Sequence, residues 1–126
     1  LFKQAIKAYP NFIQAHSNLG AVLNKLNRSK EAVSHLEKAI QLDPEFGIAY
    51  FNMGNAYLNQ GNLNEAQKAY DMAVKKGINF LSLHWNLYDI HTRQGKKSEA
   101  KKELEIILQV NPENLDAQKK LEELSH

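Results

Sequence analysis

A period of 34 residues runs through this chain and constrains its fold more than any other feature. Asn18, Asn52 and Asn86 mark the period, because each follows the last at this same offset. The offset also relates four further sets, which are Leu19, Met53 and Leu87; Glu31, Glu65 and Glu99; Ala32, Ala66 and Ala100; and Leu36, Tyr70 and Leu104. Periods of roughly 20 to 50 residues are typical of repeat proteins, in which each unit buries its apolar face against the next.

Each repeat is predicted to contain two short helices, because apolar residues recur at helical spacing in both of its halves. Asn27, Gly61 and Gly95 stand at the joins, where a residue that tolerates left-handed backbone can end the first helix. The predicted helices cover residues 13–26, 29–42, 47–60, 63–76, 81–94, 97–110 and 115–125. The sequence contains no strand pattern.

The helix starts are predicted from local motifs. Asn62 and Glu65 form a pair like a capping box, in which the asparagine caps the second helix of its repeat. The segments Asp43-Pro44-Glu45 and Asn111-Pro112-Glu113 are predicted to supply an N-cap, a proline in the first turn and an acid near the positive helix end.

The period, together with several residue types at fixed positions, resembles the tetratricopeptide repeat. The matching residues are Gly20, Gly54, Tyr57, Ala66, Tyr70, Ala73, Pro10, Pro44 and Pro112. The resemblance implies an all-α, right-handed superhelical solenoid of antiparallel helix pairs. Residues 13–46, 47–80 and 81–114 would be three repeats, residues 1–9 the second helix of a preceding partial repeat, and residues 115–126 a capping helix.

The third repeat departs from the family pattern at Tyr88, which replaces the glycine of the other repeats. We expect either that the local packing opens around this ring or that the ring points outward. The same repeat carries His91 where the others have Leu23 and Tyr57. Because His84 and His91 fall at positions that the family uses for packing, and no acidic cluster adjoins them in sequence, we interpret them as packed or hydrogen-bonded residues. No metal site and no cofactor are predicted.

Composition excludes several functions. The 16 basic and 14 acidic residues are interleaved, so no basic stripe indicates nucleic acid as a partner. No apolar run approaches the roughly 20 residues that span a bilayer. The absence of cysteine fits a reducing, cytoplasmic location. No catalytic motif is present, so an enzyme is not predicted. Because the chain opens at Leu1 within a helical pattern, we expect it to be a piece of a longer protein.

In tetratricopeptide arrays the first helices of successive repeats line a concave groove that binds ligands. The resemblance assigns to this groove Gln14, Ser17, Asn18, Ala21, Asn24 and Lys25; Ile48, Phe51, Asn52, Asn55, Leu58 and Asn59; and Ser82, Trp85, Asn86, Asp89, Thr92 and Arg93. The predicted peptide-binding residues are Asn18, Asn52, Asn55, Asn86, Phe51, Trp85, Ile48, Lys25, Asp89 and Arg93.

Asn18, Asn52 and Asn86 would form a ladder of amides, which can pair with both the N–H and the C=O of an extended peptide. This ladder resembles the one in the repeat arm of the O-linked N-acetylglucosamine transferases. The alternative is that the asparagines only bridge adjacent helices. Phe51 and Trp85 would anchor apolar ligand side chains, with the alternative that they fill the seam between repeats.

Three functions follow from this interpretation. The first is a scaffold that binds an extended peptide of another protein in the groove. The second is self-association, with the exposed N-terminal edge around Phe2, Ile6 and Tyr9 forming a homo-oligomer. The third is a substrate-recruiting arm of a larger enzyme. A cochaperone that grips acidic chaperone tails is not expected, because its basic positions carry Ser17, Ala21, Ser82 and Asn86 here.

The C-terminal helix is predicted to close the array. Leu115, Ala117, Leu121 and Leu124 would face inward, while Gln118 and Glu122 would give the outer face the polarity that a terminal cap requires.

Overall fold

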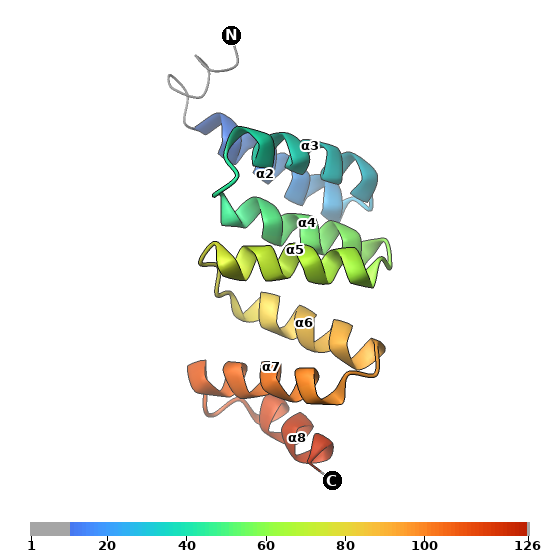
Figure 1. Ribbon diagram of the computed structural model, residues 1–126, viewed down its shortest axis with the longest axis vertical. Coiled ribbons are helices and arrows are strands. Elements are labelled where there is room, and N and C mark those ends of the chain that lie inside the picture. The colour runs from blue at the N-terminus through green and yellow to red at the C-terminus, as the bar shows by residue number, and fades with distance from the viewer. Residues whose placement is uncertain (1–10, 126) are drawn as a thin grey trace. The chain divides into compact units, whose positions relative to one another are not determined.

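The computed structural model describes residues 11–125, and it is all-helical over this range (Figure 1). The helices are α2 (Asn11–Lys25), α3 (Ser29–Leu42), α4 (Gly47–Asn59), α5 (Leu63–Lys75), α6 (Leu81–Arg93), α7 (Lys97–Val110) and α8 (Leu115–Leu124). This confirms the predicted helical-repeat fold class and places every helix end within two residues of its predicted position. The assignment of residues 1–9 to a preceding repeat lies outside the described residues.

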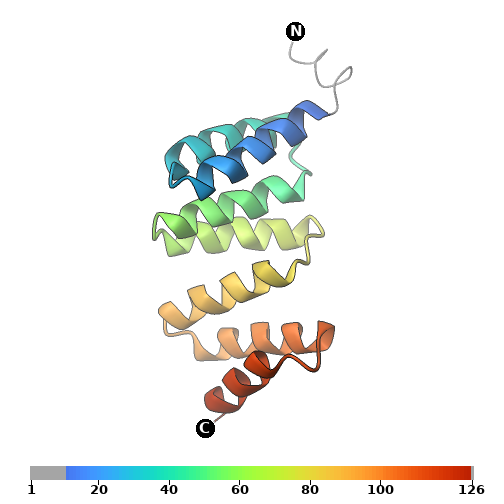
Figure 2. The same cartoon turned by 180° about the vertical axis from the view of Figure 1, so that it is seen from behind.

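Contacts divide the chain into two units, with the division between Ile78 and Asn79. In unit 1, α2 packs on α3 and α4, and α4 packs on α3 and α5. The helices α2 and α4 lie on one side of unit 1, and α3 and α5 lie on the other (Figures 1 and 2). In unit 2, α7 packs on both α6 and α8.

Small residues allow the helices of unit 1 to approach closely, as the sequence predicts. A Cβ added at Gly20 would lie 2.6 Å from Cγ of Leu36, and one at Gly54 would lie 2.6 Å from the ring of Tyr70. Leu36 and Tyr70 are fully buried in these positions. The glycines of the first helices therefore make room for large side chains from the second helices.

Tyr88 in unit 2 is accommodated by a different packing. Its ring is half-buried against the cluster of Leu104, Ile107 and Ala117 and meets Trp85 edge-on, with centroids 5.8 Å apart. Of the two expected outcomes, the local packing opens around the ring, and α8 contributes to the cluster that receives it.

The helix joins have the predicted backbone, since Asn27, Gly61 and Gly95 have φ angles of 60°, 76° and 73°. The side chain of Asn62 accepts a hydrogen bond from the backbone N–H of Glu65, at 3.5 Å, as the capping motif predicts.

The prediction for the two Asx-Pro-Glu segments was wrong. The N-cap of α4 is Phe46 and that of α8 is Asn114, so Pro44 and Pro112 lie in the preceding turns. Asp43 instead closes its turn by accepting the backbone N–H of Glu45 at 3.0 Å. A side chain this short can bond an N–H two residues on, and that local bond competes with capping a helix that begins later.

The inward assignment of Leu115 was also wrong, since 78% of its surface is exposed at the start of α8. Ala117 is fully buried, and Leu121 and Leu124 pack against the same cluster. Gln118 and Glu122 are exposed, as predicted. Leu115 lies two positions before Ala117, so a helical period of 3.6 residues turns it away from the buried face.

Candidate functional site

A depression of about 310 Å³ lies between the first helices of the two repeats of unit 1, and we call it the inner pocket. Its lining consists of Ala21, Asn24, Lys25, Phe51, Asn52, Asn55 and Asn59. All seven belong to the groove positions that the family resemblance implies. Four of them, Lys25, Phe51, Asn52 and Asn55, are among the predicted peptide-binding residues. The two helices that line the pocket, α2 and α4, pack on each other within unit 1.

Two asparagines of α4 bridge to α2 and hold the pocket together. The side-chain N–H₂ of Asn52 donates to the carbonyl oxygen of Ser17 at 3.3 Å and to its Oγ at 3.0 Å. Seven residues later, Asn59 donates to the carbonyl oxygen and to Oδ1 of Asn24, at 3.2 and 2.9 Å. Since seven residues make two helical turns, both bridges lie on one face of α4. Asn52 is buried, so the satisfied bonds of its amide stabilise the helix pair, and the more exposed Asn59 adds a second bridge.

The helix-bridging role of Asn52 matches the alternative that the sequence left open for the asparagine ladder. Asn52 is 8% exposed, whereas Asn18, at the same position of the preceding repeat, is exposed and does not line the pocket. The two residues therefore have different environments in unit 1. A contact between either asparagine and a bound peptide stays a prediction.

Tyr70 of α5 contacts two of the residues that line the inner pocket, Asn55 and Phe51. Its hydroxyl donates to Oδ1 of Asn55, and its ring lies 6.0 Å from that of Phe51 at an angle of 49°. Tyr70 is fully buried, so this support is rigid. The sequence relates Tyr70 to Leu36 and Leu104 of the other repeats, but a contact of a second helix with the groove wall is not visible in a repeat alignment. Ile48 is half-buried near the start of α4 and does not line the pocket.

Four predicted site residues belong to α6 of unit 2. Trp85 is half-buried and packs on the Leu104 cluster, which agrees with the seam-filling alternative for this ring. Asn86 is half-buried. Arg93 and Asp89 form an ion pair at 3.0 Å, one turn apart on the helix. An exposed ion pair of this kind contributes less than about 1 kcal/mol to stability, so a ligand could separate the two charges with little loss of stability.

The predicted polar packing of the histidines is confirmed. His84 is 5% exposed, with Nδ1 at 2.7 Å from the Glu103 carboxylate and Nε2 at 2.8 Å from Oδ1 of Asn79. Nε2 of His91 lies 4.0 Å from the other oxygen of Glu103. No group of three or more potential metal ligands is assembled anywhere in residues 11–125. Glu103 was missed as their partner, because it is 19 positions from His84 in sequence.

A larger depression, of about 550 Å³, lies at the turn between α2 and α3. Arg28 and Glu31 line it and form an ion pair with each other at 2.6 Å. Lys30 is the one other charged residue of its lining, and we do not assign a site to this depression. Every helix in the described range is too short or too polar to cross a bilayer.

The paired helices, the small residues between them and the pocket on the α2–α4 side define a helical-repeat protein. Three family models match the chain, one described as a TPR repeat over residues 22–61 and two described as a tetratricopeptide repeat over residues 1–34 and 47–76. The chain belongs to the tetratricopeptide-repeat family. No curated protein sequence matches it.

Solved structures share this fold at low sequence identity. YrrB, described as a TPR protein with an unusual peptide-binding site, is 21% identical with a TM-score of 0.81, and the match covers 96% of this chain and 62% of that one. The first TPR of Spaghetti (RPAP3), bound to an HSP90 peptide, is 22% identical with a TM-score of 0.77, covering 90% and 92%. MamA is 20% identical with a TM-score of 0.80, covering 98% and 72%. These identities establish the fold alone.

Proposed function

We propose that this chain is a protein-interaction module that binds an extended peptide of a partner protein in the inner pocket. The observation that carries the proposal is the lining of that pocket, in which amide side chains surround one aromatic ring and one lysine. Amides supply both donors and acceptors for a peptide backbone, and an aromatic ring supplies an apolar anchor. An active site is not proposed.

The length of the bound segment follows from the helix spacing. Adjacent helices pack about 10 Å apart and an extended chain advances about 3.3 Å per residue, so the α2–α4 interval addresses about three ligand residues. Binding of a longer segment, of about six to nine residues, that also contacts Asn86, Trp85, Asp89 and Arg93 stays a prediction of the family resemblance.

The charge of the pocket favours a neutral ligand. The RPAP3 domain among the similar structures is bound to the peptide SRMEEVD, which is acidic. Lys25 is the one charged residue that lines the inner pocket here. Strong binding of an acidic tail needs several cations in fixed positions. We therefore propose that a neutral or mixed-charge segment binds, read mainly through its backbone.

A matched pair of substitutions on α2 tests the site. Ala21→Lys fills the inner pocket with a long side chain, whereas Ala15→Lys makes the same change at an exposed position of α2 outside the pocket and outside the predicted groove. Peptides selected from a random nonapeptide display library on the wild-type protein are titrated against both variants. We expect Ala21→Lys to weaken binding at least tenfold and Ala15→Lys to leave it unchanged, with both melting temperatures near the wild-type value. Equal binding by a folded Ala21→Lys variant would move the interaction off the α2–α4 face.

One observation also favours self-association as a second function. Leu19 and Val22 on α2 and Leu26 in the turn after it form an apolar stripe, and they are 41%, 52% and 60% exposed. Ala56, the counterpart of Val22 one repeat later, is fully buried in the cluster to which α3 contributes. Exposed apolar stripes of this kind are typical of interfaces. The predicted edge residues Phe2, Ile6 and Tyr9 lie outside the described residues.

Sedimentation velocity at rising concentration tests this second function. We expect Val22→Lys to lower the average mass at high concentration. The control is Val110→Lys on α7, because Val110 is 55% exposed and lies in the other unit. A wild-type protein that stays monomeric at every concentration would rule the self-association function out.

A further inference from the structure

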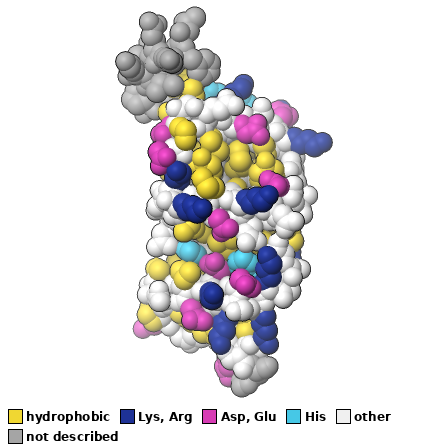
Figure 3. Space-filling model, viewed as in Figure 1, with side chains coloured by type: hydrophobic (Ala, Val, Ile, Leu, Met, Phe, Trp, Pro, Cys, Tyr) yellow, Lys and Arg dark blue, Asp and Glu magenta, His cyan; other side chains and the backbone are white. Residues whose placement is uncertain are grey.

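A third depression, lined mainly by apolar residues, lies on a different face of α4 from the inner pocket. Its volume is about 190 Å³, and its lining consists of Tyr50, Met53, Tyr57, Glu65, Lys68, Ala69 and Met72, from α4 and α5. We call it the outer groove. Figure 3 shows apolar side chains gathered over this part of unit 1, between α3 and α5, with charged side chains on their border. None of these residues belongs to the predicted peptide-binding set.

The outer groove exists because Ala69 is small. At the same position of the neighbouring repeats stand His35 and Glu103, and each reaches across to the first helix of its own pair. Nδ1 of His35 lies 3.4 Å from Nδ1 of His16, and Glu103 lies 2.7 Å from Nδ1 of His84. In the repeat between them, Ala69 cannot reach Tyr50, so the space stays open. This position therefore carries a small residue in this repeat alone among the three.

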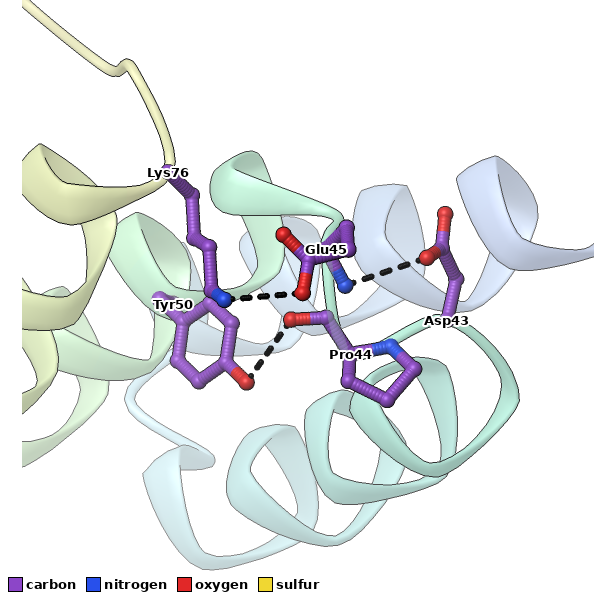
Figure 4. Close-up of polar contacts among 5 residues, drawn as sticks. All are labelled: Asp43, Pro44, Glu45, Tyr50 and Lys76. Carbon is purple, nitrogen blue, oxygen red and sulfur yellow. Dashed lines mark hydrogen bonds and ion pairs between the residues drawn. The ribbon is translucent and has the colours of Figure 1, made fainter.

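One wall of the outer groove is held in place by the turn before α4. The Tyr50 hydroxyl donates to the carbonyl oxygen of Pro44 at 3.0 Å (Figure 4). The same turn is tied to the end of α5, because Lys76 pairs with Glu45 at 2.9 Å. This bond with Glu45 raises the pKa of Lys76, so the amine stays charged at neutral pH. A wall fixed before a ligand arrives reduces the entropy lost on binding.

The other end of the outer groove is electronegative. Burial raises the pKa of Tyr57, and so do the carboxylates of Glu37 on α3 and Glu65 on α5, which both act on its hydroxyl. Lys68 offsets Glu65 only in part, because their ion pair is 3.5 Å long and both side chains are largely exposed. Within residues 11–125 Glu37 takes part in no ion pair, so its charge near Tyr57 is not offset by a paired cation.

We propose that the outer groove binds an arginine side chain presented by a partner protein. Its apolar stem would lie on the thioethers of Met53 and Met72, which adapt to irregular surfaces. Its guanidinium group would lie beside the Tyr57 ring and between the carboxylates of Glu37 and Glu65. Guanidinium groups stack on aromatic faces and pair with carboxylates through two hydrogen bonds, whereas an ammonium group is a strongly hydrated point charge. A neutral apolar side chain would leave the acidic rim unused.

The two methionines make the test direct, because they are the only ones in the chain and both line the outer groove. A protein labelled with ¹³C in the methionine methyl groups therefore gives two signals, and both report on this groove. The probes are the blocked tripeptides Leu-Arg-Leu, Leu-Gln-Leu and Leu-Glu-Leu. We expect Leu-Arg-Leu to shift both signals with a Kd of about 1 mM, a value usual for a ligand this small. Leu-Gln-Leu should bind at least about threefold more weakly, and Leu-Glu-Leu should leave the signals in place.

Three variants separate the contributions. The double variant Glu37→Gln and Glu65→Gln should weaken Leu-Arg-Leu binding about threefold to tenfold. The control Glu105→Gln, at an exposed position of α7, should leave the Kd unchanged. Ala69→Leu should fill the groove and abolish the shifts. A circular dichroism melt of each variant confirms that it is folded.

Several outcomes would overturn the proposal. One is equal binding of the arginine and glutamine probes, and another is an absence of any shift at about ten times the expected Kd. A third is a change in the methionine signals on dilution without any peptide, because a second copy of the chain would then occupy the groove. Binding in the inner pocket is tested with other variants and other peptides. A negative result for the outer groove therefore leaves the proposed function unaffected.

Discussion

The helix pairs α4–α5 and α6–α7 occupy equivalent positions of the repeat, but the side chains between their helices differ in size and polarity. In α4–α5 the closest approach is apolar, with Gly54 against the buried ring of Tyr70, and the Tyr70 hydroxyl bonds Asn55. In α6–α7 the large residue has moved to the first helix, as Tyr88, and His84 bonds Glu103 across the pair. The comparison teaches that the period fixes which positions face each other, while volume and polarity can be exchanged between the two helices.

The largest expected effect comes from removing α8, on which unit 2 depends for part of its core. A stop after Asn114 would remove Ala117, Leu121 and Leu124 and expose Leu104 and Ile107. We expect unit 2 to lose at least about 3 kcal/mol of stability, since several buried apolar side chains lose their contacts. Hydrogen exchange should show α7 amides losing protection while those of α5 change little. A soluble truncated protein with unchanged α7 protection would contradict the capping role.

Breaking the polar crossing of unit 2 should have the next largest effect. Glu103→Ala would leave Nδ1 of His84, 5% exposed, without its carboxylate partner. The expected loss is about 2–3 kcal/mol, because a buried polar group without a partner bears the full cost of leaving water. The measurement is the urea midpoint at a constant m-value. Glu105→Ala, an exposed position on the same helix, is the control and should change the midpoint little.

Filling the apolar crossing of unit 1 should cost about as much or slightly less. Gly54→Ala would place a methyl group 2.6 Å from the Tyr70 ring, which lies rigid in the core. Overpacking of this kind costs about 1–3 kcal/mol. The double variant with Tyr70→Leu should recover part of that loss, because the smaller side chain leaves room for the methyl group. If the two single losses simply add in the double variant, the contact is not the cause.

The smallest effect concerns the pH dependence of stability that His16 contributes. Burial, followed by His35 and Lys38, lowers the pKa of His16 from its ordinary value of 6.5. The folded state therefore prefers neutral His16, so stability is full above pH 6.5 and declines as the pH falls below it. His16→Phe should reduce the slope of stability against pH between about 7 and 5. An identical slope in the variant would show that His16 does not contribute.

The repeat pattern was sufficient to predict the helices, because 34-residue spacing and helical periodicity act at every position of the chain. The turn motifs were less informative, since Asp43 bonds a neighbouring N–H rather than capping the next helix. For the site, the family resemblance indicated which side of α2 and α4 lines the inner pocket. It did not predict that Asn52 and Asn59 donate to α2, nor that Tyr70 bonds Asn55, because such contacts depend on residues from different helices.

The outer groove was not predicted at all, for a related physical reason. Considered within its own repeat, Ala69 looks like an ordinary small residue at a helix-packing position. Its effect becomes visible only beside His35 and Glu103, which span the same space in their own repeats.

The position of the two methionines has a further consequence, for oxidative chemistry. The chain has no cysteine, so its entire sulfur content consists of the thioethers of Met53 and Met72 on the walls of one open groove. Oxidation converts a methionine thioether into a polar sulfoxide, which reductase enzymes can reverse. Peroxide would therefore alter this one surface of unit 1 through sulfur chemistry, while the inner pocket, lined by amides, lysine, alanine and phenylalanine, contains no sulfur to oxidise.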